Sequence, residues 1–328
     1  MRTTSQAKEI GFRLLSLPAV LFALFLTGCG PQAEAPPIRV ATSYWIGYEP
    51  FYQAEEYGFF PDGTVHLVET PNALGVEQTM RGGTIDALAL SLSRTLQYIE
   101  QGHAVSIVMV LGWSEGADKI LARPELSHIT DLKGKKVGTE LATVNSYLLF
   151  RALENHGLAL PDIQITELSN EGMEDSYLKG NIDAASVHSR AATLIEEAGA
   201  NVLYDSGEIP GEIADVLVVR NKFIEKYPKR VQQLVDGWMK AVAHMKERAA
   251  TSTIQPFLMK DADFAADYGK VKLAGYDENK AFLANDSAKL KELVEKRRAF
   301  QKAFNMPPPP TTVDFINGSA FAALDGGG

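Results

Sequence analysis

Aromatic and hydroxyl side chains follow two strand-like runs early in the folded part of the chain. Trp45 and Tyr48 come directly after the run IRVATS, and Ser91 and Ser93 end or follow the run DALALS. Flat rings can stack on a bound molecule, and hydroxyl and backbone N–H groups at a helix start can hydrogen-bond to it. We therefore predict that these four residues line a ligand site. The alternatives are core packing for the two rings and simple helix capping for Ser93.

A second group of short polar side chains joins the strand-like run KKVGT to a helical pattern. Thr143, Asn145 and Ser146 lie at the start of this helix. A helix start presents N–H groups that can hold an acidic or polar part of a ligand. We predict ligand contact here, with capping by Thr143 alone as the alternative.

Four ionisable residues complete the predicted ligand site. Glu115 and Asp118 follow the buried run AVSIVMVLGW, His188 follows the run DAASV, and Asp215 begins the run DVLVVR. A carboxylate at such a position can pair with a ligand amine. A solvated turn for Glu115 and Asp118, and a basic neighbour for Asp215, are the alternatives. The acidic candidates, with Glu140, outnumber the basic Arg94, Lys119 and Arg190, which slightly favours a nitrogenous or zwitterionic ligand.

The sequence carries no common catalytic or cofactor motif. The patterns GxSxG, GxxxxGK[ST] and GxGxxG are absent, and no two histidines stand at i, i+4 with a glutamate between them. Asp261, Asp263 and Asp267 resemble a calcium loop but lack its glycine and terminal glutamate. We therefore expect a binding protein with no catalytic residues, no metal and no cofactor.

The elements that must position these residues alternate between strand and helix. Short β-branched runs and helical patterns alternate from residue 38 to about residue 220 in two sets, and the remainder is helical. Such alternation predicts an α/β fold with mostly parallel sheets flanked by helices. We predict two lobes, residues 38–120 plus 219–328 and residues 121–218, joined by two hinge crossovers near 119–122 and 215–219. The gap between such lobes is a natural site for a small molecule.

The N-terminal segment has the three parts of a secretory signal. Basic residues precede an apolar run at 14–26, which at 13 residues is shorter than the roughly 20 that span a bilayer. The run ends in Leu26-Thr27-Gly28-Cys29, which resembles a bacterial lipobox. We predict a signal peptide at 1–28, lipidation of Cys29 with membrane attachment through the lipid, and a tether at 29–37. A thiol that merely ends a signal peptide is the alternative.

Composition excludes several classes of protein. The 328 residues include 32 Lys and Arg against 41 Asp and Glu, a formal charge of −9, which argues against nucleic-acid binding. Because Cys29 is the only cysteine, the chain can form no intramolecular disulfide and no cysteine-based zinc site.

Three stretches carry a resemblance to a known family: TSYWIGYEPFYQAEEYGFF from Thr42, DLKGKKVGTELATVNSYLLFRALENHGL from Asp131, and DSGEIPGEIADVLVVRNKFIEKYPKRV from Asp205. They are similar to the nitrate/sulfonate/taurine/bicarbonate-type substrate-binding proteins of bacterial ABC importers, whose fold thiamine-pyrimidine-precursor binding proteins share. The resemblance implies a monomer with the type II periplasmic-binding-protein fold, a clamshell whose closure on a ligand is read by a permease. Where relatives often carry an aromatic-acid-proline motif, this chain has Val187-His188-Ser189-Arg190.

The combined expectation is a lipid-anchored, extracytoplasmic solute-binding protein that captures a small polar molecule and delivers it to an ABC permease. One alternative is a lipoprotein that senses its ligand and acts on a membrane signalling receptor. The other is an enzyme, because eukaryotic pyrimidine-precursor synthases share the fold of this family. Those synthases use a cysteine-rich motif that this chain lacks.

Overall fold

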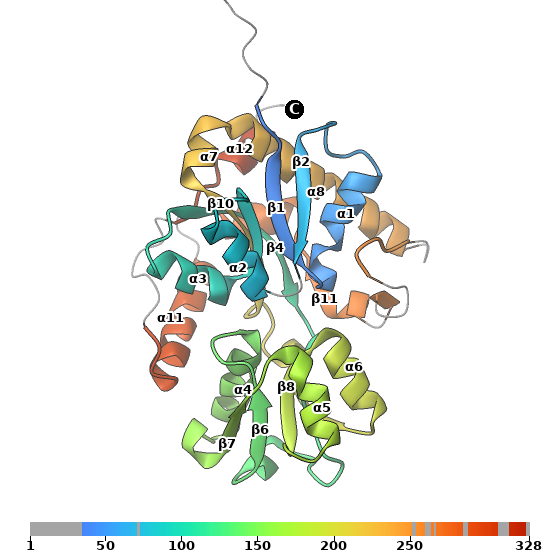
Figure 1. Cartoon of the computed structure of the whole chain (residues 1–328), viewed down its shortest axis with the longest axis vertical. Coiled ribbons are helices and arrows are strands. Elements are labelled where there is room, and N and C mark those ends of the chain that lie inside the picture. The colour runs from blue at the N-terminus through green and yellow to red at the C-terminus, as the bar shows by residue number, and fades with distance from the viewer. Residues whose placement is uncertain are drawn as a thin grey trace, which may run out of the picture. The chain divides into compact units, whose positions relative to one another are not determined.

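The computed structural model describes residues 35–70, 73–250, 254–259, 264–265, 267–284, 288–307 and 315–325 (Figure 1). The predicted signal peptide, the lipidation site Cys29 and most of the predicted tether lie outside the described residues. Residues 35–328 form a compact unit of their own. Two β-sheets organise this unit, and they define the two lobes.

Lobe 1 is built on a 6-stranded sheet with the order β11-β4-β10-β3-β1-β2. Its strands are β1 (Ile38–Ser43), β2 (Val65–Thr70), β3 (Ala87–Ser91), β4 (Val105–Ser114), β10 (Ala214–Arg220) and β11 (Val271–Leu273). Strand β1 pairs in parallel with β2 and β3, whereas β10 runs antiparallel to β3 and β4, and β11 antiparallel to β4. The continuous apolar runs of β3 and β4 are buried because helices cover both faces of the sheet.

The helices of lobe 1 come from both ends of the described chain. They are α1 (Glu49–Glu56), α2 (Ala73–Arg81), α3 (Leu92–Glu100), α7 (Asn221–Lys226), α8 (Pro228–Ala249), α10 (Tyr276–Phe282) and α12 (Ser319–Asp325). Helix α8 confirms the amphipathic pattern of the sequence: Trp238 is fully buried, with its ring centroid 4.6 Å from that of Phe51 on α1. Among the described residues, no helix is both long and apolar enough to cross a bilayer.

Lobe 2 is built on a 5-stranded sheet with the order β7-β6-β8-β5-β9. Its strands are β5 (Asp118–Ala122), β6 (Lys136–Thr139), β7 (Gln164–Glu167), β8 (Ala184–His188) and β9 (Asn201–Asp205), and its helices are α4 (Val144–Asn155), α5 (Met173–Leu178) and α6 (Ser189–Glu197). Strand β6 pairs in parallel with β7 and β8, and only β5 runs against its neighbours. The predicted α/β architecture with two sheets is confirmed, but both sheets are mixed: among the described strands, two of the five pairings in lobe 1 and two of the four in lobe 2 are parallel.

The crossovers between the sheets lie earlier than predicted. The predicted lobe boundaries at 120/121 and 218/219 fall inside β5, which belongs to lobe 2, and inside β10, which belongs to lobe 1. Ser206 joins the two crossovers, because its Oγ accepts from the Gly116 N–H (2.6 Å) and lies 2.7 Å from the Ser114 Oγ. The sequence prediction was wrong here because an apolar run does not show which sheet the strand joins.

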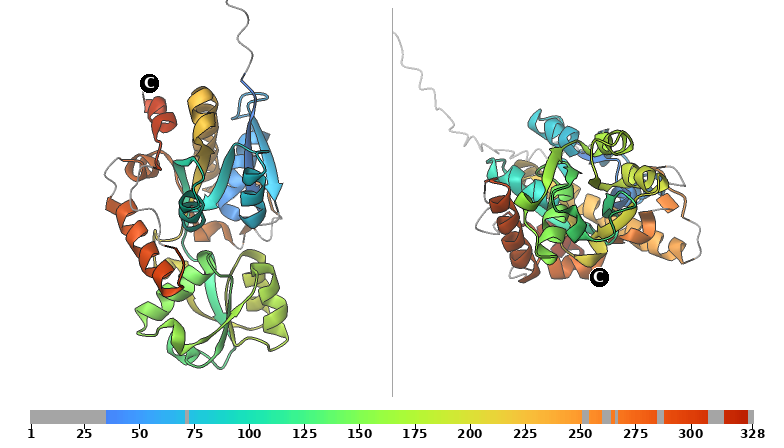
Figure 2. Two further views of the ribbon diagram at one scale, coloured as in Figure 1. Left: turned by 60° about the vertical axis from the view of Figure 1, so that its left-hand side comes forward. Right: turned by 90° about the horizontal axis from the view of Figure 1, so that it is seen from below.

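Helix α11 (Ala288–Ala303) is a third link between the lobes (Figure 2). Leu290 and Leu293 belong to the core of lobe 1, whereas Phe300 packs in the core of lobe 2, with its ring centroid 5.4 Å from that of Tyr147. The prediction that residues 219–328 belong wholly to lobe 1 is therefore wrong for the end of this helix.

A buried carboxylate fixes α11 to lobe 2 and to the second crossover. Glu212 accepts hydrogen bonds from Lys296 Nζ (2.7 Å), Arg151 Nε (3.0 Å) and Tyr147 OH (2.6 Å), and its backbone oxygen accepts from Arg297 Nη2 (3.1 Å). These partners outweigh burial and hold the pKa of Glu212 below its usual value.

Candidate functional site

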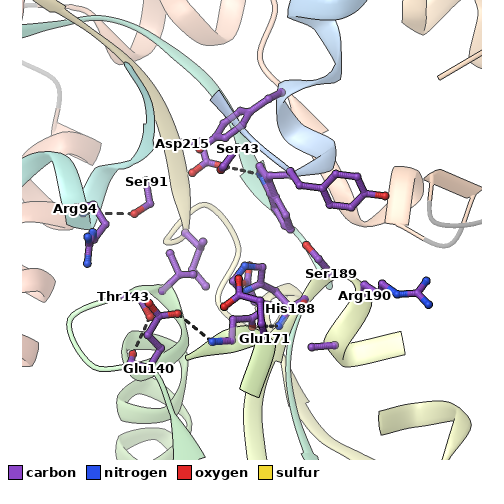
Figure 3. Close-up of a pocket in the computed structure, with 18 of the residues that line it drawn as sticks. Ser43, Ser91, Arg94, Glu140, Thr143, Glu171, His188, Ser189, Arg190 and Asp215 are labelled. Atoms are coloured by element: carbon purple, nitrogen blue, oxygen red, sulfur yellow. Dashed lines mark hydrogen bonds and ion pairs between the residues drawn. The ribbon is translucent and has the colours of Figure 1, made fainter. Parts of the chain in front are cut away.

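A cavity of about 370 Å³ lies at the edge where the strands of both sheets end (Figure 3). Its lobe 1 wall comes from the end of β1, the end of β3 and the start of β10. Its lobe 2 wall comes from the start of β5 and the segments that follow β6, β7 and β8. Because β5 and β10 run against the parallel strands, they present their first residues at the edge where the parallel strands present their last.

The lobe 1 wall is organised around Trp45. Its Nε1 donates to Asp215 Oδ2 at 2.7 Å, and the indole is 9% exposed. A Cβ on Gly47 would lie 2.5 Å from Trp45 Nε1, so the glycine is needed for the indole to turn toward Asp215. Tyr48, in the short helix η1 (Ile46–Tyr48), also lines the cavity, and burial together with the Asp215 carboxylate raises its pKa well above 10.

The lobe 2 wall is organised around His188, which is held by two asparagines. Asn170 clamps the backbone of His188, since its Oδ1 accepts from the His188 N–H (3.1 Å) and its Nδ2 donates to the His188 carbonyl (3.3 Å). The same Oδ1 accepts from Asn145 Nδ2 (3.2 Å), which leaves Asn145 Oδ1 facing His188 Nδ1 at 2.9 Å. The imidazole therefore carries a proton on Nδ1. The ring also meets Trp45 edge to face, with centroids 5.7 Å apart.

The segment before α4 contributes Thr143 to the cavity and places Asn145 and Ser146 behind the wall. The Thr143 hydroxyl accepts from the Asn145 N–H (3.2 Å) and donates to the Glu140 carbonyl (2.8 Å). Ser146 Oγ accepts from the Thr143 N–H (3.3 Å) and completes a capping box. Asn145 and Ser146 are fully buried in these roles and do not line the cavity.

Two further predicted residues lie outside the cavity lining. Helix α3 begins at Leu92, so Ser91 is its cap and accepts from the Arg94 N–H (3.4 Å), whereas Ser93 is buried inside the first turn. Glu115 is exposed in the first crossover, where its N–H donates to the Lys270 carbonyl (2.7 Å). Expecting Ser93 and Glu115 in the lining was wrong because the helix starts at Leu92, two residues earlier than capping by Ser93 implies, and the crossover turns Glu115 to solvent.

Two buried carboxylates line the cavity, and one acts electrostatically on the other. Asp118 is 1% exposed, and burial raises its pKa, opposed by His188, whose Nδ1 lies 3.9 Å from Oδ1. Burial, and then repulsion from Asp118, raises the pKa of Asp215 to about 7, although hydrogen bonds from Trp45 and Tyr48 oppose the shift. The arrangement can accept hydrogen bonds from a cationic group or hold a proton between neutral and acid pH.

Comparison with protein families decides where this arrangement belongs. A family model described as the NMT1-like family matches residues 31–257, more than half of the chain. The chain belongs to the NMT1-like family. It is 24% identical over 229 residues to the taurine-binding periplasmic protein of Escherichia coli, a match that covers 68% of this chain and 69% of the relative.

Solved structures of similar fold extend over most of this NMT1-like chain. The periplasmic aliphatic sulphonate binding protein SsuA from Escherichia coli superposes with a TM-score of 0.70 over 88% of this chain and 99% of its own, at 17% identity. The desulfurization enzyme DSZB superposes with a TM-score of 0.64 over 89% of this chain and 99% of its own, at 15% identity. These likenesses confirm the predicted periplasmic-binding-protein fold, and at such identities they show the fold alone.

Of the predicted ligand residues, the cavity of this NMT1-like chain brings together Trp45, Tyr48, Ser91, Asp118, Thr143, His188 and Asp215. The sequence reasoning missed Asn170, which follows β7 and clamps His188. Trp45 was predicted from the strand-end rule, which places polar and aromatic residues that follow a strand in the ligand site. The same rule, applied to the residues after β7, would have found Asn170. The sequence reasoning also missed Ser189, whose φ of 54° lies in the left-handed region and lets the chain turn from β8 into α6 at the cavity wall.

Proposed function

We propose that this protein is an extracytoplasmic solute-binding protein that captures a small polar molecule in the cavity between its lobes. The observation that carries the proposal is the cavity itself, lined from both sheets by aromatic, hydroxyl and carboxylate side chains. Two crossovers and helix α11 join the lobes, and the crossovers are positions at which the lobes can hinge around a ligand. The names of the relatives, a taurine-binding and an aliphatic sulphonate binding periplasmic protein, support capture of a small organic solute.

Delivery to an ABC permease and attachment to a membrane through Cys29 extend this proposal. Both rest on the lipobox-like Leu26-Thr27-Gly28-Cys29 and on the family resemblance. A wild-type chain expressed in a bacterium should partition with membranes, and a Cys29→Ser chain should be released from them, because the acyl chains supply the membrane affinity. A Cys29→Ser chain that stays fully with the membranes would contradict the anchor.

Ligand capture is tested by thermal unfolding of the chain from residue 30. Nitrate, sulfonates, bicarbonate, thiamine precursors, amines and amino acids form the panel. A ligand at one hundred times its Kd should stabilise the native state by about 2.7 kcal/mol and raise the Tm saturably. Trp45→Phe should weaken the hit, whereas Trp113→Phe, on β4 outside the cavity lining, should leave it unchanged. Equal weakening by both variants would contradict the assignment of the cavity.

Binding rather than turnover is the proposed activity, although DSZB shows that this fold also supports an enzyme. The only cysteine is Cys29, so the cavity holds no thiol nucleophile. Conversion of a bound ligand by the purified protein, followed by mass spectrometry, would overturn this part of the proposal.

A further inference from the structure

The cavity wall is predominantly acidic. Five carboxylate residues line it, Asp118, Glu140, Glu171, Glu174 and Asp215, against the guanidinium groups of Arg94 and Arg190. The Arg94 Nε forms an ion pair at 2.6 Å with the Glu77 carboxylate, which does not line the cavity. An anionic ligand would therefore meet excess negative charge, whereas a cationic one would be attracted.

Asp118 is the group in this wall whose hydrogen bonding is incomplete. It is 1% exposed, and within the described chain neither carboxylate oxygen has a partner at good hydrogen-bond geometry; the neighbouring Ser114 hydroxyl acts on the carboxylate and lowers its pKa, but burial outweighs it. His188 Nδ1 lies 3.9 Å away but already donates to Asn145. Arg297 also lowers the pKa of Asp118 electrostatically; its Nη2 donates to the Glu212 backbone, and its Nε and Nη1 are buried without a hydrogen-bond partner in the described chain, so it makes no direct bond to Asp118. A buried carboxylate with incomplete hydrogen bonding is costly, and a donor that arrives with a ligand would reduce that cost.

Asp215 faces the same cavity and is fixed by Trp45. The indole N–H donates to it at 2.7 Å and holds the aromatic ring beside the carboxylate, and the Tyr48 hydroxyl is a second donor to it. The charged and titratable neighbours that act on Asp215 are Asp118 and Tyr48. An ammonium group placed here would meet two carboxylates and aromatic side chains, which is the combination that binds organic cations.

We propose that the ligand of this cavity carries a cationic nitrogen, an organic ammonium group that the Asp118 and Asp215 carboxylates bind beside the Trp45 indole. The inference rests on the proposed solute-binding function and names its ligand class. The ammonium group replaces a proton that the two carboxylates otherwise retain, so binding releases a proton near neutral pH and strengthens as the pH rises through about 7.

Matched probes test the inference on the chain from residue 30. Taurine and isethionate differ by an ammonium in place of a hydroxyl, and benzylamine and benzyl alcohol differ in the same way. At least one amine should raise the Tm while its hydroxyl partner does not. Calorimetry at pH 7 in two buffers of different ionisation enthalpy should detect proton release. Asp118→Asn and Asp215→Asn should each weaken the amine at least tenfold, and Asp236→Asn, on the exposed face of α8, should not.

The outcomes separate this inference from the function on which it rests. The two cavity variants should unfold at or above the wild-type Tm without ligand, which shows that they are folded. Hydroxyl partners that bind as tightly as the amines, or amine affinities unchanged in both variants, overturn the inference. If only nitrate or amine-free sulfonates bind, and Trp45→Phe weakens them, the ammonium inference fails while solute binding stands. If no solute of any class binds, both fail.

Discussion

Replacing Asp215 by asparagine should stabilise the unliganded protein at neutral and alkaline pH. Burial and repulsion from Asp118 raise the pKa of Asp215 from 3.8 to about 7, so the folded state binds the proton more tightly than the unfolded chain. The stability that this carboxyl contributes is complete below the unfolded pKa and is lost as the pH rises through the folded pKa. About three pKa units, at about 1.4 kcal/mol each, correspond to roughly 4 kcal/mol.

The asparagine side chain keeps the shape of the carboxyl and can still accept from Trp45, but it does not ionise. Asp215→Asn should therefore exceed the wild-type free energy of unfolding by about 2 kcal/mol at pH 5 and by about 4 kcal/mol at pH 8. Urea denaturation at several pH values measures the difference. Asp236→Asn, which removes only a surface partner of Lys240, should stay within about 1 kcal/mol of wild type. A difference that does not change with pH, or a less stable variant at pH 8, would refute the reasoning.

Three other perturbations address the parts that hold the site. Glu212→Gln should lower the free energy of unfolding by about 3 kcal/mol, because it removes the buried carboxylate that pairs with the half-buried Arg151 and Lys296. Glu154→Gln at the surface should cost less than about 1 kcal/mol, and equal losses would contradict the buried network. Nitrogen NMR should find neutral His188 protonated on Nδ1, and an Nε2–H form would disprove the asparagine clamp. Gly237→Ala should destabilise by about 1–3 kcal/mol in thermal denaturation, because its Cβ would overlap the Phe60 ring; an unchanged Tm would show that the ring moves freely.

The strand-end rule located much of the candidate site from sequence, because its physical basis is local. A strand followed by a turn and a helix start can be read from residue types, as in TSYWIGYEP, where Trp45 and Tyr48 both line the cavity. The same rule failed for Ser93, because a shift of two residues in the helix start decides whether a side chain caps the helix or lies inside it. With α3 starting at Leu92, Ser91 becomes the cap and Ser93 turns into the helix. Whether the lining residues bind a ligand stays a prediction.

The strands that reverse direction were harder to place. Asp118 is the first residue of β5 and Asp215 the second of β10, and their runs look like any other buried strand in the sequence. Only hydrogen-bond pairing assigns β5 to lobe 2 and β10 to lobe 1, so the predicted crossovers fell inside the strands. The packing of α11 against both lobes was missed for the same reason. An amphipathic pattern shows that one face of a helix is buried, but it does not show which part of the protein covers that face.

The sequence by itself determined the α/β class, the two sets of strands and helices, and the family resemblance, because periodicity and motifs are properties of consecutive residues. The tertiary structure alone decided which residues meet. It brings Asp118 and Asp215 into one cavity from positions almost one hundred residues apart. It buries the Asp118 carboxylate with incomplete hydrogen bonding in the described chain, and it turns the Trp45 N–H toward Asp215. Burial and charge repulsion depend on distances in space, and no local pattern carries that information.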